Sequence, residues 1–380
     1  MSNSDVTSSQ QTATHTQTVA GIRPHHISVP QADIDDLRER LARTRWAPDL
    51  PGTGWERGVP TAYLRKLAAY WAGEYDWRAH EAALNAYPQF VAPIDGVDVH
   101  FLHVRSAEPG ATPLLLLHGW PEFWFVWRKC IPDLARDFDV IAPDLRGFGD
   151  TEKPSLNPSA GATADVHAAD ILALMNNLGV ASAGIVSHDV GAYIAQSLAR
   201  QHPQRLSGLF FFNCPYPGIG PRWAAPDHLI EIWYQSFHQQ PWAAALVGSS
   251  REACRLYFRH FLSHWAHDPH AFDEDIEAWV DNFLQPGNLQ GGFNWYISAH
   301  QARLAVMRGE APKSQRSPIL LPVRVLWGES DPILKSEWTD RLGEYFTNVK
   351  VTTVPEAGHF VHYEKPDLAC REIRAFFQGL

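Results

Sequence analysis

The chain has 380 residues, 45% hydrophobic and 19% charged, which is enough apolar surface for a sizeable core and excludes a wholly disordered or fibrous protein. Lys and Arg number 32 against 42 Asp and Glu, so the net charge of -10 is opposite in sign to that of a typical nucleic-acid-binding protein. The four cysteines form neither a zinc pattern nor a disulfide framework, which predicts a reducing, cytoplasmic setting.

The first 20 residues are polar and rich in Ser, Thr and Gln, without the apolar stretch of a signal peptide or membrane anchor. Such a segment cannot bury enough surface to offset the entropy lost on ordering, so we expect a disordered tail over 1–20.

Residues 21–107 form a separate N-terminal region in which helical patterns precede strand patterns. The sequence predicts helices over 32–46 and 61–77, and a hairpin whose two strands, 89–94 and 97–104, flank the turn signal Asp95-Gly96. We expect this amphipathic meander to pack on another part of the protein.

From residue 108, short unbroken apolar runs alternate with helical patterns, which is typical of a parallel sheet covered by helices on both faces. The strand-like runs lie at 113–119, 138–144, 182–188, 205–213, 322–328 and 349–355, and a helix is expected over 334–346. Between 216 and 316 this pattern gives way to helical periodicity rich in Trp and His. We therefore expect an α/β core over 108–215 and 317–380, with a helical cap inserted over 216–316.

The stretch from Gly184 to Ala192 ends one of these apolar runs and opens a helix, with a sharp strand-to-helix turn between them. A turn that presents a catalytic side chain above a sheet needs small residues two positions before and after it. Ser187 and Gly191 flank Asp189 in this way, whereas Ser187 as the presented residue would have Ile185 before it. We predict Asp189 to be a nucleophile, rather than a helix cap. A carboxylate nucleophile displaces a leaving group from an sp³ carbon and forms an alkyl ester.

Hydrolysis of that ester requires a general base and an acid that orients it, later in the chain. His359 is the predicted base and Asp331 the predicted acid, with Glu329 as the alternative acid. The sequence HGWP after the run 113–119 predicts an oxyanion hole made of the backbone N–H groups of Trp120 and Val190.

Five motifs, HGWPE, DLRGFGDTEKP, SHDVGA, GESDP and GHFVHYEKP, resemble those of the α/β-hydrolase-fold epoxide hydrolases, and the resemblance runs from about Arg23 to the end. The segments TRWAPDL, YLRKLAAYW and IDGVDVHFLHVRS are similar to the N-terminal domain of the microsomal and juvenile-hormone branch. The chain departs from that branch in having no membrane anchor and in having Val190 where Trp is common.

The resemblance implies an enzyme that needs no cofactor or metal and converts a small-molecule epoxide and water to a vicinal diol, in detoxification or secondary metabolism. It also implies two cap tyrosines that protonate the epoxide oxygen. Tyr296 matches one position and Tyr234 the other, with Tyr216 and Tyr257 as substitutes for Tyr234.

Candidate substrate-binding side chains are Trp120, Trp124, Trp295 and Phe360. All of the 15 Trp except Trp327 and Trp338 fall in the N-terminal region, near the HGWP sequence or in the cap. We interpret this concentration as a meeting of meander, loop and cap around a bulky, apolar epoxide.

Other readings stay open. A dehalogenase would use the same carboxylate, and a small-molecule receptor could share the scaffold without catalysis. The histidines of HWAHDPH, His264, His267 and His270, could suggest a metal, but a cap surface is the simpler interpretation. His188, beside Asp189, is expected to be structural. The sequence leaves open whether the chain forms a homo-oligomer.

Overall fold

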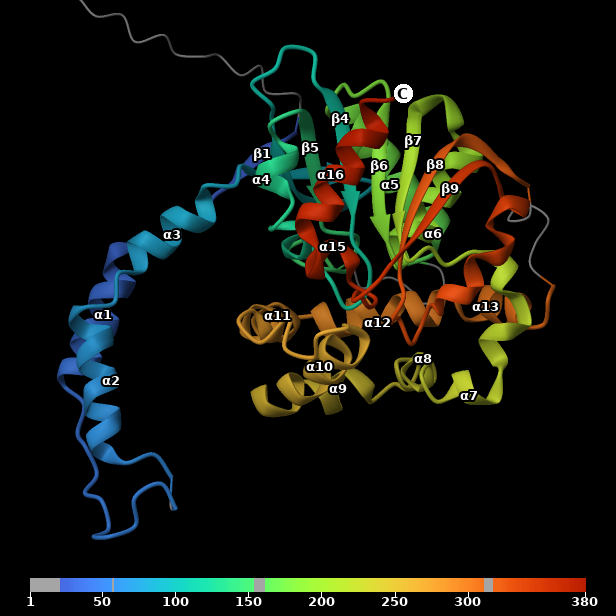
Figure 1. Ribbon diagram of the computed structural model, residues 1–380. Coiled ribbons are helices and arrows are strands. Elements are labelled where there is room, and N and C mark those ends of the chain that lie inside the picture. The colour runs from blue at the N-terminus through green and yellow to red at the C-terminus, as the bar shows by residue number, and fades with distance from the viewer. Residues whose placement is uncertain (1–20, 57, 154–160, 311–316) are drawn as a thin grey trace, which may run out of the picture.

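The computed structural model describes residues 21–56, 58–153, 161–310 and 317–380, so the tail predicted over 1–20 lies outside the described residues. Within these residues a nine-stranded sheet has the order β1-β2-β3-β5-β4-β6-β7-β8-β9 (Figure 1). The strands are β1 (Arg23–His25), β2 (Gln89–Ile94), β3 (Val97–Val104), β4 (Thr112–Leu117), β5 (Phe138–Pro143), β6 (Ala183–His188), β7 (Leu206–Phe212), β8 (Ile319–Gly328) and β9 (Phe346–Val354).

The sheet is parallel from β4 to β9, as the unbroken apolar runs predicted. Strand β6 is buried along its whole length, and the Leu114–Leu117 stretch of β4 is also buried. The fold class predicted from the sequence, a mostly parallel α/β sheet, is confirmed.

The predicted hairpin forms β2 and β3. Asp95 (φ 46°) and Gly96 (φ 75°) both adopt the left-handed conformation that two-residue hairpin turns favour. Strand β3 also pairs antiparallel with β5. The hairpin therefore extends the core sheet, and the expected boundary at 107 falls between β3 and β4 within one continuous sheet.

The helices α1 (Gln31–Ala42), α2 (Thr61–Gly73) and α3 (Trp77–Asn85) form an arm that leaves the body of the molecule between β1 and β2 (Figure 1). The arm was expected to pack on another part of the chain, but no residue of α1 is buried and only Ala68 of α2 is. Many of its large apolar side chains face solvent, with Trp55 62% exposed. The predicted meeting of meander, loop and cap is thus wrong for these helices, because α1 and α2 mainly contact each other.

Helices cover both faces of the sheet, with α5 and α6 on one face and α16 on the other (Figure 1). Thr163 caps the first turn of α5, because its side chain accepts a hydrogen bond from the N–H of Val166. The helix expected over 334–346 is a 3-10 segment, η4. The elements are η1 (Trp124–Trp127), α4 (Ile131–Leu134), α5 (Ala164–Asn177), α6 (Val190–Gln201), η2 (Pro203–Arg205), η4 (Ser336–Glu344), α15 (Val361–Glu364) and α16 (Pro366–Phe377).

The insertion after β7 is helical, as predicted, and lies across the carboxyl ends of the parallel strands (Figure 1). Its elements are η3 (Pro217–Ala224), α7 (Pro226–Leu229), α8 (Trp233–Phe237), α9 (Ala243–Val247), α10 (Arg251–Trp265), α11 (Ile276–Leu284), α12 (Asn288–Ser298) and α13 (His300–Met307). Of the helices in the described residues, none has the length and hydropathy needed to cross a membrane.

Close backbone approach holds this cap onto the core. A Cβ added to Gly291 of α12 would lie 2.0 Å from the carbonyl oxygen of Gly147, so only glycine fits at 291. Nearby, the indole N–H of Trp279 donates to the carbonyl of Pro121, at 2.7 Å. The cap is therefore seated on the loops that follow β4 and β5.

The turn between β6 and α6 requires a small residue at its helical end. A Cβ added to Gly191 would lie 2.4 Å from the carbonyl oxygen of Leu117 at the end of β4. This contact lets the first turn of α6 approach the sheet.

Replacement of Gly191 by Ala should therefore force α6 away from β4. We expect Gly191→Ala to lower the free energy of unfolding by roughly 1–3 kcal/mol, measured by urea denaturation. Gly343→Ala is the matched control, since an added Cβ there meets nothing within 4 Å. Equal stability of the two variants would contradict this account.

Candidate active site

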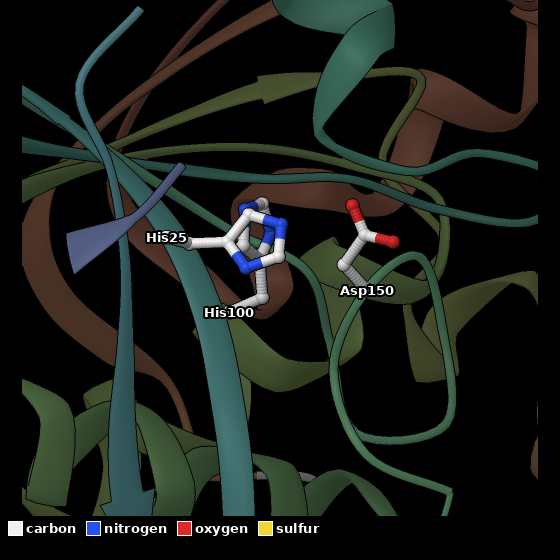
Figure 2. A group of neighbouring side chains, drawn as sticks. All are labelled: His25, His100 and Asp150. Atoms are coloured by element: carbon white, nitrogen blue, oxygen red, sulfur yellow. The ribbon is translucent and has the colours of Figure 1, made fainter. Parts of the chain in front are cut away.

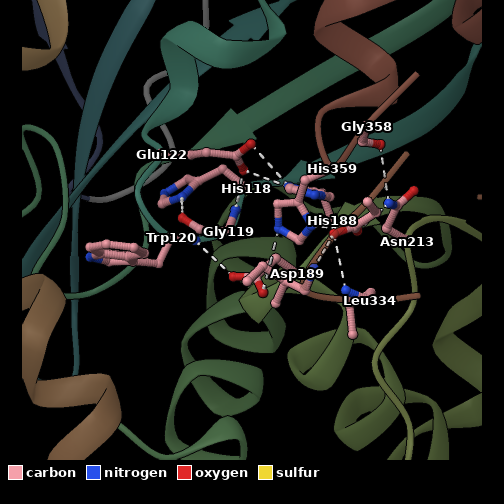
Figure 3. A network of polar contacts seen from close by, with 12 residues as sticks. His118, Gly119, Trp120, Glu122, His188, Asp189, Asn213, Leu334, Gly358 and His359 are labelled. Atoms are coloured by element: carbon pink, nitrogen blue, oxygen red, sulfur yellow. Dashed lines mark hydrogen bonds and ion pairs between the residues drawn. The ribbon is translucent and has the colours of Figure 1, made fainter. Parts of the chain in front are cut away.

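Asp189 sits at the turn between β6 and α6, with φ 47° and ψ -113°. The side chain of Asp189 is 18% exposed, and its Oδ1 accepts a hydrogen bond of 3.0 Å from the backbone N–H of Trp120 (Figure 3). Val190 is the first residue of α6, so its N–H has no acceptor within the helix. The two N–H groups predicted as oxyanion donors therefore belong to the two segments that meet at this carboxylate.

His359 and Asp331 form a buried pair. Figure 3 shows His359 next to Asp189. The distance from His359 Nδ1 to Asp331 Oδ2 is 2.7 Å, and His359 Nε2 lies 4.0 Å from Asp189 Oδ2. The alternative acid, Glu329, is exposed. The geometry thus favours Asp331 over Glu329.

The charges of this pair depend on each other. Burial alone would lower the pKa of His359, but the carboxylates of Asp331 and Asp189 outweigh it and raise that pKa to about 9. Burial likewise opposes the charge of Asp331, yet His359 and several hydrogen-bond donors hold the pKa of Asp331 below its usual value. At neutral pH His359 is therefore an imidazolium between two carboxylates.

Asn213 supports the acid and was not singled out in the sequence. It follows β7 with φ 44°, and its side-chain N–H₂ donates to Asp331 and, at 3.2 Å, to the carbonyl of Gly358. Its side-chain oxygen accepts from the N–H of Gly328, at 2.9 Å. Its position at the end of the apolar run 205–213 was a signal available in the sequence.

A second buried carboxylate, Glu122, lies on the other side of His359 (Figure 3). Glu122 accepts a hydrogen bond from the N–H of Gly119, and its carboxylate is 3.0 Å from Nδ1 of His188. Burial disfavours the charged form of Glu122. The neighbouring rings of His188 and His362 outweigh this effect and hold the pKa of Glu122 well below its usual value. His188 is therefore engaged behind the site, as expected.

Asp189, Tyr234 and Tyr296 line one cavity of about 260 Å³ beneath the cap. The centres of the two tyrosine rings are 5.5 Å apart, and the ring planes are nearly perpendicular. Burial raises the pKa of both, so each hydroxyl keeps its proton at neutral pH. The substitutes are occupied elsewhere: Tyr216 donates to the carbonyl of Trp338, and the hydroxyl of Tyr257 lies 2.6 Å from His238 Nε2.

The candidate substrate-binding side chains divide into two groups. Trp295 lines the cavity, whereas Trp120, Trp124 and Phe360 are not among its lining residues. The ring of Trp120 stacks on Tyr234 at 5.2 Å, and that of Phe360 packs against His359 at the same distance. Both rings therefore support site residues from behind. Arg303, which the sequence did not indicate, also faces the cavity.

Histidines and carboxylates gather at two other places in the described residues. Figure 2 shows His25, His100 and Asp150 at the end of the sheet. The ring nitrogens of His100 face Asp144 Oδ2, at 2.8 Å, and Gln89 Oε1, at 3.0 Å, so neither is available to a metal. The second group is Glu122, His188 and His362.

The histidines of HWAHDPH do not converge. His264 is 2.7 Å from Glu231, His267 is 2.8 Å from Ser330, and His270 is 2.8 Å from Asp273. Each ring is paired separately, which favours the cap-surface interpretation.

Residues 22–126 match the family described as Epoxide hydrolase N terminus, and residues 112–366 match the alpha/beta hydrolase fold family. The soluble epoxide hydrolase of Corynebacterium sp. (strain C12) is 32% identical over 300 residues, covering 76% of this chain and 96% of that protein. Epoxide hydrolase 1 of Oryctolagus cuniculus is 34% identical over 202 residues, covering 50% of this chain but only 44% of that relative. A solved structure, the epoxide hydrolase CorEH without ligand, superposes with a TM-score of 0.66 at 30% identity, covering 77% of this chain and 98% of that one.

The sheet, the cap and the carboxylate at the strand-to-helix turn define an α/β hydrolase. The chain belongs to the epoxide hydrolase family, with that family's N-terminal region, and is therefore a hydrolase. The resemblance seen in its motifs is confirmed.

The buried pair predicts how His359 titrates. In Asp331→Asn the largest contribution that raises the pKa of His359 is lost while desolvation remains, so we expect that pKa to fall by about 1–3 units from the value of about 9. NMR titration of labelled histidine would measure it, with the exposed Glu329→Gln as control. An unchanged titration in Asp331→Asn would refute the assignment.

Proposed function

We propose that this protein converts epoxides to vicinal diols through a covalent ester on Asp189. The observation that carries the proposal is that Asp189, Tyr234 and Tyr296 line one cavity, with the imidazole of His359 4.0 Å from the Asp189 carboxylate. A metal or cofactor is not part of the proposed reaction.

In the first step, an oxygen of Asp189 attacks one ring carbon of the epoxide. A carbon–oxygen ester bond forms, the ring carbon–oxygen bond breaks, and its electron pair stays on the former ring oxygen. An alkoxide is too basic to leave unaided, so Tyr296 or Tyr234 donates a proton to it. The raised pKa values of both tyrosines mean that the proton is present when the substrate arrives.

In the second step, water cleaves the ester. His359 removes a proton from water as the water oxygen adds to the carbonyl carbon of Asp189, and the N–H groups of Trp120 and Val190 hold the oxyanion. The ester carbon–oxygen bond then breaks as the imidazolium of His359 protonates the leaving diol oxygen, and the proton of the regenerated Asp189 carboxyl group returns to the tyrosinate left by the first step. Esterification neutralises Asp189, one of the charges that raise the pKa of His359, so forming the ester favours the neutral imidazole that this step needs.

The dehalogenase alternative fits less well. A halide leaving group needs N–H donors and no proton, and Val190 stands where a Trp after the nucleophile would supply one. Trp120 is not among the residues that line the cavity. Release of halide from haloalkanes, without diol formation from styrene oxide, would favour the dehalogenase.

The proposed substrate is a bulky, largely apolar epoxide, since Trp223, Trp295, Val306, Met307 and Ile333 all line the cavity. A reducing compartment such as the cytoplasm suits the four cysteines, which are buried and unpaired. We also propose that the protein self-associates through the exposed apolar side chains of α1 and α2. Analytical ultracentrifugation tests this proposal by measuring the mass of the protein in solution.

Single turnover in oxygen-18 water tests the covalent route. Because the first diol takes its new oxygen from Asp189, the label should appear in the Asp189 carboxylate and not in that diol. Mass spectrometry of peptide and product measures both. Label in the diol of the first turnover would contradict the ester intermediate.

Two variants separate the steps. Asp189→Asn should abolish turnover, because the amide is a poor nucleophile. His359→Gln should still form the ester and then stall, so intact-protein mass spectrometry should find the chain heavier by the mass of one epoxide. A receptor without catalysis would bind epoxides and show neither effect.

The tyrosines should act in ester formation. We expect Tyr296→Phe and Tyr234→Phe each to slow ester formation by roughly 10²- to 10⁴-fold in stopped-flow measurements. Tyr257→Phe is the matched control, because the hydroxyl of Tyr257 contacts His238 and is not at the cavity wall. A loss confined to Tyr257→Phe would reassign the second donor.

A further inference from the structure

A single cationic side chain, that of Arg303 on α13, lines the cavity that holds Asp189. Its Nη2 donates to the carbonyl oxygen of Tyr296 at 2.6 Å, and its guanidinium carbon lies 5.0 Å from the centre of the Tyr296 ring. One backbone bond uses a small part of what a guanidinium with five N–H groups can donate.

Arg303 lacks the carboxylate partner that two buried arginines have. Arg146 is paired with Asp170 at 2.6 Å and Arg324 with Glu372 at 2.6 Å, whereas none of the ion pairs within the described ranges includes Arg303. Asp165 also lines the cavity, but its Oδ1 is taken by the side chains of Ser197 and Gln201.

An unpaired cation in an apolar cavity carries a desolvation cost that a bound anion would offset. Burial lowers the pKa of Arg303, yet a guanidinium stays charged at any physiological pH. A carboxylate fits this group, because its two oxygens match the two parallel N–H bonds of the guanidinium fork.

We infer that the preferred substrates are epoxides that carry a carboxylate at the far end of an apolar spacer, with the carboxylate bound by Arg303. This inference rests on the proposed function. The oxirane would lie between Asp189 and the two tyrosines, and the spacer keeps the carboxylate away from the negative charge of Asp189.

The cavity has room for such a spacer. A second cavity of about 390 Å³ shares Ala164, Asp165, Tyr193 and Val306 with the first. It contains Arg200, which donates to the carbonyls of Gln196 and Ser317 and is likewise in none of the ion pairs found between described residues. Arg200 therefore adds a second cation along this path, beside the Asp165 carboxylate that lines both cavities.

The carboxylate lies far from the reacting carbon, so its binding energy is the same in the ground state and the transition state and should lower KM more than it raises kcat. The test compares 10,11-epoxyundecanoate and 5,6-epoxyhexanoate with their primary amides, which have the same shape and no charge. We expect the wild type to prefer at least one acid over its amide by about 10- to 100-fold in kcat/KM.

The acid-to-amide ratio should fall to near one in Arg303→Met and recover in part in Arg303→Lys. Arg308→Met is the matched control, because Arg308 ends the same helix, is exposed and is not at the cavity wall. It should keep the wild-type ratio. A ratio that Arg303→Met leaves unchanged, or a wild type without acid preference in either pair, would overturn the inference.

The two proposals fail separately. Hydrolysis of styrene oxide reports on the proposed function alone. If the wild type turned over no epoxide, calorimetric titration with the dihydroxy acids and their amides would still test Arg303. The wild type should bind each acid more tightly than its amide, whereas Arg303→Met should bind the two equally. Equal binding of acid and amide to the wild type would overturn the inference whatever the activity.

Discussion

The hydrogen bond from the N–H of Trp120 to Asp189 joins the two segments on which the site depends. One is the loop after β4 and the other is the turn after β6, and neither could approach the other if it carried ordinary side chains. A Cβ added to Gly119 would lie 2.6 Å from Cβ of Asp189. Gly191 likewise has no room for a Cβ, because the end of β4 lies too close to it. The sheet brings these segments together because β4 and β6 are neighbours.

Charge is then balanced around this contact. His359 has negative groups on three sides, Asp331, Asp189 and Glu122, all of which favour its charged form against the cost of burial. The pair would be costly in an interior without further donors. Asn213 and the N–H groups of Ile333 and Leu334 supply them to Asp331, which fixes the carboxylate and, through it, the ring of His359.

Much of this arrangement could be predicted from the sequence, because it depends on local chemistry. Small residues at 187 and 191 identify the turn around Asp189, and unbroken apolar runs identify parallel strands. Chain order then predicts His359 and Asp331.

Contacts between distant segments could not be predicted in this way. Arg303 lies in a helical pattern that resembles any surface helix, and only the seating of the cap places it at the wall of the cavity. Trp124 and Phe360 are close to catalytic residues in sequence, yet they pack behind the site because the turns that carry them face the core. The prediction that the arm packs on another part of the protein failed for a different reason. An amphipathic pattern predicts that a helix has an apolar face, but it does not identify what covers that face.

The arm has a further consequence for how the protein can change during evolution. It starts directly after β1 and ends directly before β2, and these two strands pair with each other, His25 opposite Gln89. In topological terms the whole excursion is one long hairpin loop. The entropy of closing such a loop grows only with the logarithm of its length, about 0.6 kcal/mol for each doubling. Selection can therefore lengthen, shorten or rewrite the arm for its external contacts while the sheet and the catalytic turn below it keep their stability.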